Sequence, residues 1–581
     1  MHSTITNTNM LLGIDLGTTN SLVAVWQNGQ AILIPNVLGD YLTPSCVGMD
    51  EDGTILVGKA ARDRLQTHPE KTTSLFKRHM GTARTHRIGT VNYRPEELSS
   101  FVLRSLKEDA EAFLGCTIDA AVITVPAYFS DSQRKATRAA GQLAGLKVDR
   151  LLSEPTAAAL AYGLNEAKDE SKFLVFDLGG GTFDVSVIEK FEGVMEVRAT
   201  AGDNFLGGED FTQAIALHYL EKSGVPSEAG LDPAFQQQLV ARAESFKLDL
   251  PSRKSDSLTA QWQGVSYSVE IDEDLFSKLT EDLLARLRMP VERALRDARI
   301  RATEIDNVIL AGGATRMPLV RQLVTRMFGR FPNSGVNPDE VVAAGAAVMA
   351  GLKMKDAALN EIVMTDVCPY TLSTDIAIRL ADGTEVEGVS SPIIERNTVV
   401  PVSRVKTYWP GKDNQPYIGV GVYQGEARYV QDNIKLGELR VKLPPAPRAD
   451  GACDVRFTYD VNGLLEVETR IQKTGETQRL VIQSSIEGLS EAEIEERLRD
   501  LAQLKIHPRD KLENRTLLAQ AERRFQQLLG GMRDRLGAEM MRFEAALEAQ
   551  NERACQAART RLRQVLEALD RDNYFVPEFD N

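Results

Sequence analysis

The chain has 581 residues, enough for several domains with a large core, and a formal net charge of −14. This acidic balance argues against nucleic-acid binding, which requires a basic face. Five scattered cysteines form no CxxC pair, which argues against disulfides and a zinc site. Because no apolar run reaches about 18 residues and residues 1–10 contain no Lys or Arg, we expect neither a membrane span nor a signal peptide, and we predict a cytoplasmic protein. We also expect a monomer.

The first chemical feature is an acidic, glycine-rich loop directly after a short apolar strand. The loop, DLGTTNS, runs from Asp15 to Ser21. Glycine lets backbone N–H groups approach a phosphate closely, and turns of this kind form anion-binding nests. The leading aspartate can bind the Mg²⁺ that neutralises the phosphate. Taken alone, such a loop is more often an ordinary β-turn.

Helical and β-rich patterns alternate up to about residue 355, as expected of an α/β domain. Residues 131–143 are predicted to form a helix capped by Ser130 or Asp131. Another helix is predicted to start at Glu154-Pro155, since proline is favoured at the first helical position.

A second loop of the same kind, DLGGGTFD at residues 177–184, follows the apolar residues 173–176. Both loops begin Asp-Leu-Gly, and both predict a strand, a tight turn and another strand. Two such loops could clamp one nucleotide from both sides, which is harder to attribute to chance than one loop.

A third glycine element follows the apolar strand predicted at residues 308–311. The flat surface of Gly312-Gly313 suits a sugar and an α-phosphate, and the planar guanidinium of Arg316 could lie against a base. The alternative is a simple turn from a strand to a helix. Residues 340–352 predict a helix of small side chains that could pack closely against a neighbour.

The pattern changes after a short acidic and apolar connector at residues 356–366. We therefore divide the chain into an α/β part (1–355), this connector, a β part (367–486) with alternating apolar residues, and a helical part (487–581). The helical part opens with a capping-box pattern at residues 490–493, followed by apolar Ile494, Leu498, Leu501 and Leu504 on one face.

Together these motifs resemble the DnaK-type heat shock protein 70 chaperone family over about residues 11–484. Further family motifs occur in the family's order: VPAYF (125–129), EPTAAALAYG (154–163), GGEDF (207–211), NPDEVVAAGAA (337–347), ERNT (395–398), YQGE (423–426) and NGLLEV (462–467). Their details are most similar to the short bacterial branch called HscC. The resemblance implies an actin-like α/β ATPase domain with two lobes and a duplicated nucleotide-binding core, an antiparallel β-sandwich that binds peptides, and a shortened helical lid.

The resemblance also implies ATP and ADP as ligands, Mg²⁺ and K⁺ near Asp15 and Asp177, and roles in hydrolysis for Lys77, Glu154, Asp177 and Thr182. The matching nucleotide-contact positions are Gly17, Thr18, Thr19, Asn20, Gly179, Gly180, Gly181, Gly208, Glu244, Lys247, Gly312, Gly313, Arg316 and Asp339. Pro251 departs from the family pattern, because it stands where the family has an adenosine-binding serine. The segment after it, 253–268, is short, which implies fast nucleotide exchange with little dependence on an exchange factor.

In the β part, the resemblance implies that Tyr408, Ile418 and Val420 line an apolar slot for an extended client peptide. The alternative for each is ordinary sandwich core. Coupling between the two parts is implied for Pro126, Arg134, Arg150, Ile362, Val363 and Asp366. Arg150, Thr156 and Asp366 also match the family's docking surface for a J-domain cochaperone, while Ser153 departs from it.

Two other functions stay open at this point. An actin-fold small-molecule kinase would share the paired phosphate loops, but would not need the β part or the helical lid. A non-hydrolysing exchange or scaffold protein of the same superfamily would not need Lys77, Glu154, Asp177 and Thr182. An ATP-dependent peptide-binding chaperone accounts for all of these features.

Overall fold

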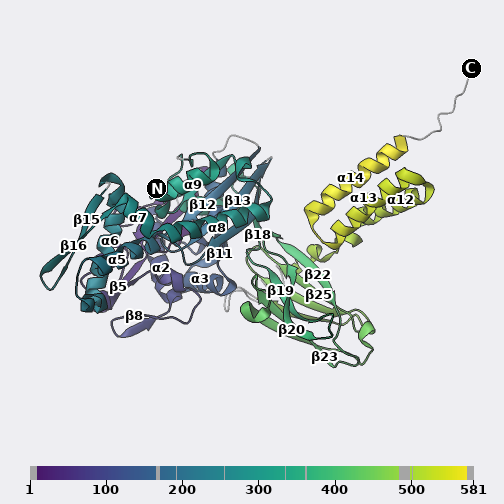
Figure 1. Cartoon of the computed structure of the whole chain (residues 1–581), viewed down its shortest axis with the longest axis horizontal. Helices are drawn as coiled ribbons and strands as arrows, with labels where there is room; N and C mark the ends of the chain where they lie inside the picture. Colours follow the sequence, from purple (N-terminus) through teal and green to yellow (C-terminus); the bar gives the residue numbers. More distant parts are fainter. Residues whose placement is uncertain are drawn as a thin grey trace, which may run out of the picture.

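The computed structural model describes residues 10–164, 170–191, 193–253, 255–333, 335–359, 363–482, 498–499 and 501–571. Figure 1 shows an α/β part (purple to teal), a β-sandwich (green) and a group of helices (yellow) that projects away from the sandwich. Within the described residues, no helix is both long enough and apolar enough to cross a membrane.

The first lobe of the α/β part is built on a sheet with the order β11-β10-β1-β2-β3, and β4 pairs with β2. β1 lies parallel to β10 and antiparallel to β2, so the first phosphate loop is the turn of the β1–β2 hairpin. The strands are β1 (Leu11–Asp15), β2 (Asn20–Gln27), β3 (Gln30–Ile34), β4 (Thr43–Pro44), β10 (Ala120–Val125) and β11 (Lys147–Ser153).

The second lobe repeats this arrangement. β12 is antiparallel to β13 and parallel to β17, and the second phosphate loop is the turn between β12 and β13. The sheet order is β17-β12-β13-β14-β18-β21. Its strands are β12 (Glu170–Leu178), β13 (Phe183–Phe191), β14 (Val194–Asp203), β17 (Asn307–Ala311), β18 (Val363–Val367) and β21 (Val399–Val400). The predicted two-lobed α/β fold with a duplicated core is confirmed.

Smaller sheets and the helices complete the α/β part. The remaining strands are β5 (Cys46–Met49), β6 (Ile55–Val57), β7 (Thr72–Ser74), β8 (His86–Ile88), β9 (Val91–Tyr93), β15 (Ser255–Trp262) and β16 (Val265–Asp272). The helices are α1 (Lys59–Arg64), α2 (Pro95–Leu114), α3 (Asp131–Leu143), α4 (Glu154–Gly163), α5 (Gly208–Lys222), α6 (Pro233–Arg253), α7 (Glu273–Leu279), α8 (Glu281–Ala298), α9 (Pro318–Phe328) and α10 (Val341–Lys353). The predicted start of α3 is confirmed, because the Ser130 backbone N–H donates to Gln133 Oε1 at 2.9 Å.

Two helices of small residues, α4 and α10, join the lobes. They pack in one buried cluster that includes Val122 of the first lobe and Val175 of the second. A Cβ added to Gly345 would lie 1.7 Å from the Ala157 carbonyl oxygen, so the two helix backbones touch. The predicted close packing of this small-residue helix is confirmed.

The β-sandwich consists of two four-stranded antiparallel sheets, β20-β19-β23-β24 and β22-β25-β26-β27. Its core contains Val420, Val422, Val455, Phe457 and Val467. The strands are β19 (Leu372–Arg379), β20 (Glu385–Ile394), β22 (Val402–Tyr408), β23 (Tyr417–Gln424), β24 (Ile434–Lys442), β25 (Cys453–Tyr459), β26 (Leu465–Ile471) and β27 (Thr477–Ile482).

The connector is docked as a strand of the second lobe. Within β18, Val363, Met364 and Thr365 pair in parallel with residues 194–196 of β14. The end of β18 pairs with β21, a short strand between β20 and β22 of the sandwich along the chain. The sheet of the second lobe therefore continues through the connector to the sandwich.

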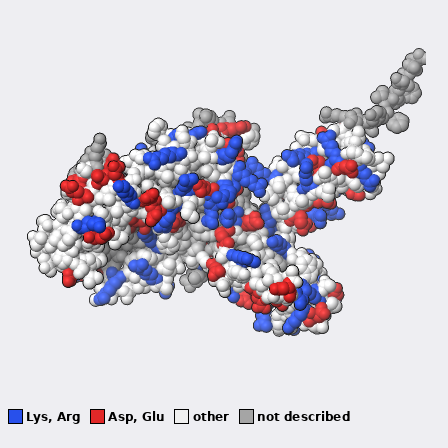
Figure 2. All heavy atoms as spheres, in the orientation of Figure 1, with Lys and Arg blue, Asp and Glu red and all other residues white. Residues whose placement is uncertain are grey.

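The helical part packs as α12 (Leu512–Gln527), α13 (Gly530–Glu548) and α14 (Glu552–Arg571) around a core of its own. Gln550, in the turn before α14, donates to the Val405 carbonyl at 2.8 Å and accepts from the Val405 N–H at 3.2 Å, so its amide covers the free edge of β22. Nearby, Arg553 lies 3.6 Å from Glu189 of β13. Figure 2 shows basic side chains gathered where the α/β part approaches these helices. The predicted capping box at residues 490–493 and Ile494 lie outside the described residues. Leu498 and Leu501 are buried, whereas Leu504 is exposed, so the predicted apolar face does not extend to Leu504.

We predict that Gly345→Ala destabilises the α/β part by about 3 kcal/mol or more, because the added methyl group collides with the α4 backbone and neither helix can move without opening the core. Urea unfolding measures this change. Gly531→Ala is the matched control, since open space surrounds that helical glycine and the change should stay within about 1 kcal/mol. Equal stability of both variants would contradict the close contact.

Candidate functional site

The structure brings the two phosphate loops face to face. A Cβ added to Gly180 would lie 1.8 Å from Thr19 Oγ1, and one added to Gly181 would lie 2.7 Å from Thr18 Cγ2. Two hydrogen bonds at Gly17 fix the first loop. Ser45 Oγ donates to the Gly17 carbonyl at 2.7 Å, and the Gly17 N–H donates to Ser21 Oγ at 3.1 Å. Loops from both lobes thus form one backbone-lined site.

The other predicted glycine elements join the same site. The Gly208 N–H donates to the Gly179 carbonyl at 2.9 Å. A Cβ on Gly312 would lie 2.3 Å from the Leu178 carbonyl oxygen, and one on Gly313 would lie 2.8 Å from Asp339 Oδ1. Side chains larger than hydrogen cannot fit at these points, so the polypeptide backbone itself forms the floor of the site.

Buried carboxyl groups gather beneath the loops. Asp177, Asp184 and Glu154 are buried, and Asp15 is partly buried beside them. Thr124 Oγ1 donates to Asp15 Oδ1 at 2.9 Å. Lys77, in the short 3₁₀ turn Phe76–His79, is buried and places its Nζ 2.8 Å from Glu154 Oε1. The structure therefore unites four residues from different elements: Asp15, Lys77, Glu154 and Asp177.

Burial raises the pKa of each aspartate, and repulsion by Glu154 adds to the effect. The pKa of Asp15 rises to about 7, that of Asp184 to about 8, and that of Asp177 well above its usual range. A cation bound beside carboxyl groups with raised pKa values would stabilise their charged form and lower these pKa values again. The site therefore favours cation binding.

The donor set fits Mg²⁺. Aspartate oxygens are the ligands that hard cations prefer, and Mg²⁺ usually keeps several waters while using one or two carboxylates and substrate phosphates. In the described part of the chain, no three His, Cys, Asp or Glu side chains are grouped so as to hold a metal directly. An ion near Asp15 and Asp177 would therefore complete its coordination with water and phosphate.

Lys247, one of the predicted nucleotide-contact residues, lies on α6 and makes three hydrogen bonds. Its Nζ donates to the Gly208 carbonyl and to Thr212 Oγ1 at 2.9 Å each, and to Glu244 Oε2 at 2.6 Å. The ammonium group thereby ties α6 to the glycine at the start of α5. Pro251 lies in the last turns of the same helix.

Arg316 holds a fixed orientation at the edge of the site. Its Nε donates to Asp339 Oδ2 at 2.9 Å, and its Nη2 donates to Asn337 Oδ1 at 2.7 Å. The side chain is half exposed, with a relative accessibility of 50%. Part of this side chain is therefore accessible at the edge of the site.

The predicted coupling residues lie at the junction with the connector. Arg134 donates to the Ala127 and Phe129 carbonyls at 3.2 and 3.3 Å and so braces the turn that begins at Pro126. Arg150 is buried, and this burial lowers its pKa, whereas the nearby carboxylate of Asp366 raises it. Ile362 lies outside the described residues.

The three predicted peptide-slot residues are not equivalent. Val420 is buried in the sandwich core, and Tyr408 lies against that core with its hydroxyl 3.0 Å from Ser391 Oγ. Ile418 packs on a second, smaller cluster that contains Val441 and Leu443. Val420 is therefore a structural residue in this arrangement, whatever further role it has.

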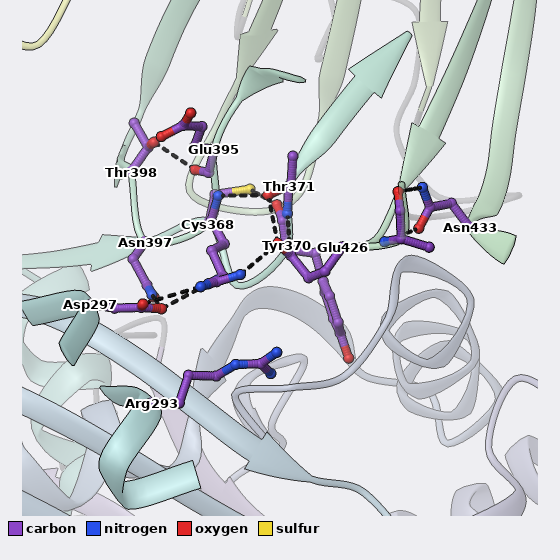
Figure 3. A network of polar contacts seen from close by, with 12 residues as sticks. Arg293, Asp297, Cys368, Tyr370, Thr371, Glu395, Asn397, Thr398, Glu426 and Asn433 are labelled. Carbon is purple, nitrogen blue, oxygen red and sulfur yellow. Dashed lines mark hydrogen bonds and ion pairs between the residues drawn. The ribbon is translucent and has the colours of Figure 1, made fainter. Parts of the chain in front are cut away.

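Sequence reasoning missed an ionic network between α8 and the sandwich (Figure 3). Arg396 donates to both oxygens of Asp297 at 2.7 and 3.1 Å, and to Glu426 Oε2 at 2.7 Å. Asn397 donates to Asp297 Oδ2 at 2.9 Å and accepts from the Thr200 N–H at 2.9 Å. The ERNT and YQGE motifs contain Arg396, Asn397 and Glu426. The charged residues in these two motifs were the feature of the sequence that could have indicated this network.

The fold and the site define an α/β ATPase joined to a β-sandwich and a helical part. The family model described as Hsp70 protein matches residues 11–90 and 82–576. Chaperone protein DnaK of Thermotoga petrophila is 43% identical over 507 residues, which is 84% of this chain and 83% of that protein. Chaperone protein DnaK of Thermotoga neapolitana is 42% identical over the same length. The chain belongs to the Hsp70 family and is an ATP-dependent chaperone with ATPase activity, and DnaK-type members of this family bind client peptides and J-domain cochaperones.

We predict that the free energy of unfolding, measured in EDTA without nucleotide, falls as pH rises from about 4 toward 8. Asp15 and Asp184 have higher pKa values in the folded state than their ordinary 3.8, so the folded protein binds more protons than the unfolded chain in this range. Urea unfolding at several pH values measures the slope.

Asp184→Asn should flatten this slope, because its amide does not titrate. Asp52→Asn is the matched control, since Asp52 is fully exposed and its pKa is lowered rather than raised. A parent protein whose stability is constant or rises over this range would contradict the buried acid cluster.

Proposed function

We propose that this protein hydrolyses ATP between its two phosphate loops, and that the nucleotide controls capture and release of extended apolar client peptides by the sandwich. The observation that supports this site most directly is the buried contact of 2.8 Å between Lys77 and Glu154, in the same cluster as Asp15 and Asp177. A kinase reading is weaker, because it leaves the docked connector and the sandwich without a role.

In this mechanism the backbone of both loops binds the β- and γ-phosphates, with Thr18, Thr19 and Thr182 as hydroxyl donors. Lys77 donates to a γ-phosphate oxygen and orients the attacking water, and Glu154 accepts a hydrogen bond from that water. Asp15 and Asp177 would hold hydrated Mg²⁺, with K⁺ beside it, and the cations would neutralise charge on the phosphates. Lys247 and Glu244 position the adenosine side, and Arg316 stacks on the base.

We assign the chain to the short HscC branch and propose rapid ADP release with little need for an exchange factor. In support, β15 and β16 are joined by a tight turn at Gln263-Gly264 rather than by a long loop. Arg150 is buried beside Asp366, so we propose that a J-domain cochaperone acts on the junction that holds the connector. The cytoplasmic location and the monomeric state stay predictions.

We predict that Lys77→Ala slows hydrolysis of pre-bound ATP by roughly 100-fold or more, because a buried donor to the transition-state charge is lost. ATP affinity should change little, since the loops supply most phosphate contacts. Single-turnover hydrolysis and equilibrium binding measure the two effects. Lys71, which is partly exposed and paired with Glu51, offers the control variant Lys71→Ala. Hydrolysis at the parent rate by Lys77→Ala would refute this assignment.

We predict that Val363→Asp combined with Met364→Asp uncouples the two parts of the chain. Met364 packs on the core between the lobes, so a charge there opposes the pairing of β18 with β14. The factor by which ATP accelerates peptide release should then fall by about 10-fold or more, while each part still binds its own ligand. Stopped-flow release of a labelled peptide measures this effect. Val265→Asp, on the exposed β15–β16 hairpin, is the control, and retained acceleration in the double variant would place coupling elsewhere.

A further inference from the structure

The turn formed by residues 126–129, here called the Tyr128 turn, touches the hydrolytic site at two points. The Tyr128 N–H donates to Asp184 Oδ1 at 3.1 Å. The next residue, Phe129, is buried, and Lys77 Nζ lies 5.6 Å from the centre of its ring. A shift of this turn would therefore move groups that contact both Asp184 and Lys77.

Side-chain donors hold three consecutive carbonyl groups of the Tyr128 turn. Arg134 binds the first and the third, those of Ala127 and Phe129. The middle one, the Tyr128 carbonyl, accepts from Asn204 Nδ2 at 2.7 Å and from the Tyr370 hydroxyl at 2.6 Å. Arg134 and Asn204 belong to the α/β part, whereas Tyr370 follows the connector, so one of these donors leaves if the sandwich undocks.

Tyr370 is well placed to act as this donor. Its ring lies 4.4 Å from the ring of Tyr128, centre to centre, at a tilt of 43°. Burial raises the pKa of Tyr370 far above its usual value, so the hydroxyl keeps its proton and donates at physiological pH. The Tyr128 hydroxyl has a separate partner, Arg293 Nη1, at 3.0 Å. Figure 3 shows the Tyr370 side chain reaching down from the sandwich toward the α/β part.

We propose that Tyr370 is a positioning residue for ATP hydrolysis: in the docked arrangement its hydroxyl holds the Tyr128 turn, and thereby restrains Asp184 and Lys77, until a bound peptide releases the sandwich. In the docked arrangement Lys77 is paired with Glu154 at 2.8 Å, so its position depends on the turn and on Glu154 together. Coupling between two ligands is reciprocal, so a bond that exists in only one arrangement links ATP at the site to peptide in the sandwich. This inference rests on the proposed function.

The test is Tyr370→Phe, which removes the hydroxyl but keeps the ring, while Asn204 still satisfies the Tyr128 carbonyl. We expect single-turnover hydrolysis without peptide to rise about 3- to 10-fold, the effect of one hydrogen bond. Stimulation by an apolar peptide should fall by the same factor, with ATP affinity and melting temperature unchanged. Tyr429→Phe, another sandwich tyrosine, should behave like the parent protein.

A double-mutant cycle separates positioning from general stability. In the protein that already carries Val363→Asp and Met364→Asp, Tyr370→Phe should change hydrolysis less than twofold, because the sandwich no longer holds the turn. An equal effect in both backgrounds, or parental rates and stimulation in Tyr370→Phe alone, would overturn the inference. If ATP and peptide do not affect each other in the parent protein, the proposed function fails and this inference fails with it.

Discussion

The burial of several carboxyl groups in one place is the constraint on which the rest of this structure depends. Asp15, Asp177, Asp184 and Glu154 come from four separate elements, and removal from water makes the charged forms of the three aspartates unfavourable. A fold gains nothing in stability from such an arrangement. A cation and a phosphate bound between the surrounding glycine loops would make the charged carboxylates favourable.

That constraint also explains why the site lies between two lobes. Each lobe supplies one hairpin with an aspartate at the end of its first strand, and α4 and α10 join the lobes through backbones in contact. Small relative movements of the lobes therefore change the spacing of the loops directly. The sheet of the second lobe extends through β18 to the sandwich, so main-chain hydrogen bonds link the second lobe directly to the sandwich.

Much of this organisation was predictable from local patterns. Both hairpins, α3 with its Ser130 cap, the strand before Gly312 and the small-residue helix α10 occur where the sequence indicates them, because each depends on neighbouring residues. The resemblance to a known family added Lys77, which no local pattern singles out. The roles assigned to Val420 and Ile418 were less predictable, since alternation along a strand cannot tell a sandwich core from a ligand slot.

The sequence alone determined the family, the paired phosphate loops and the order of the parts, because these follow from short motifs and their spacing. Only the tertiary structure decided which distant side chains meet. Asp297 meets Arg396, and the Tyr370 hydroxyl meets the Tyr128 carbonyl, across 99 and 242 positions of the chain. Such contacts depend on how whole sheets and helices are placed relative to one another, and a pattern confined to neighbouring residues carries no information about that placement.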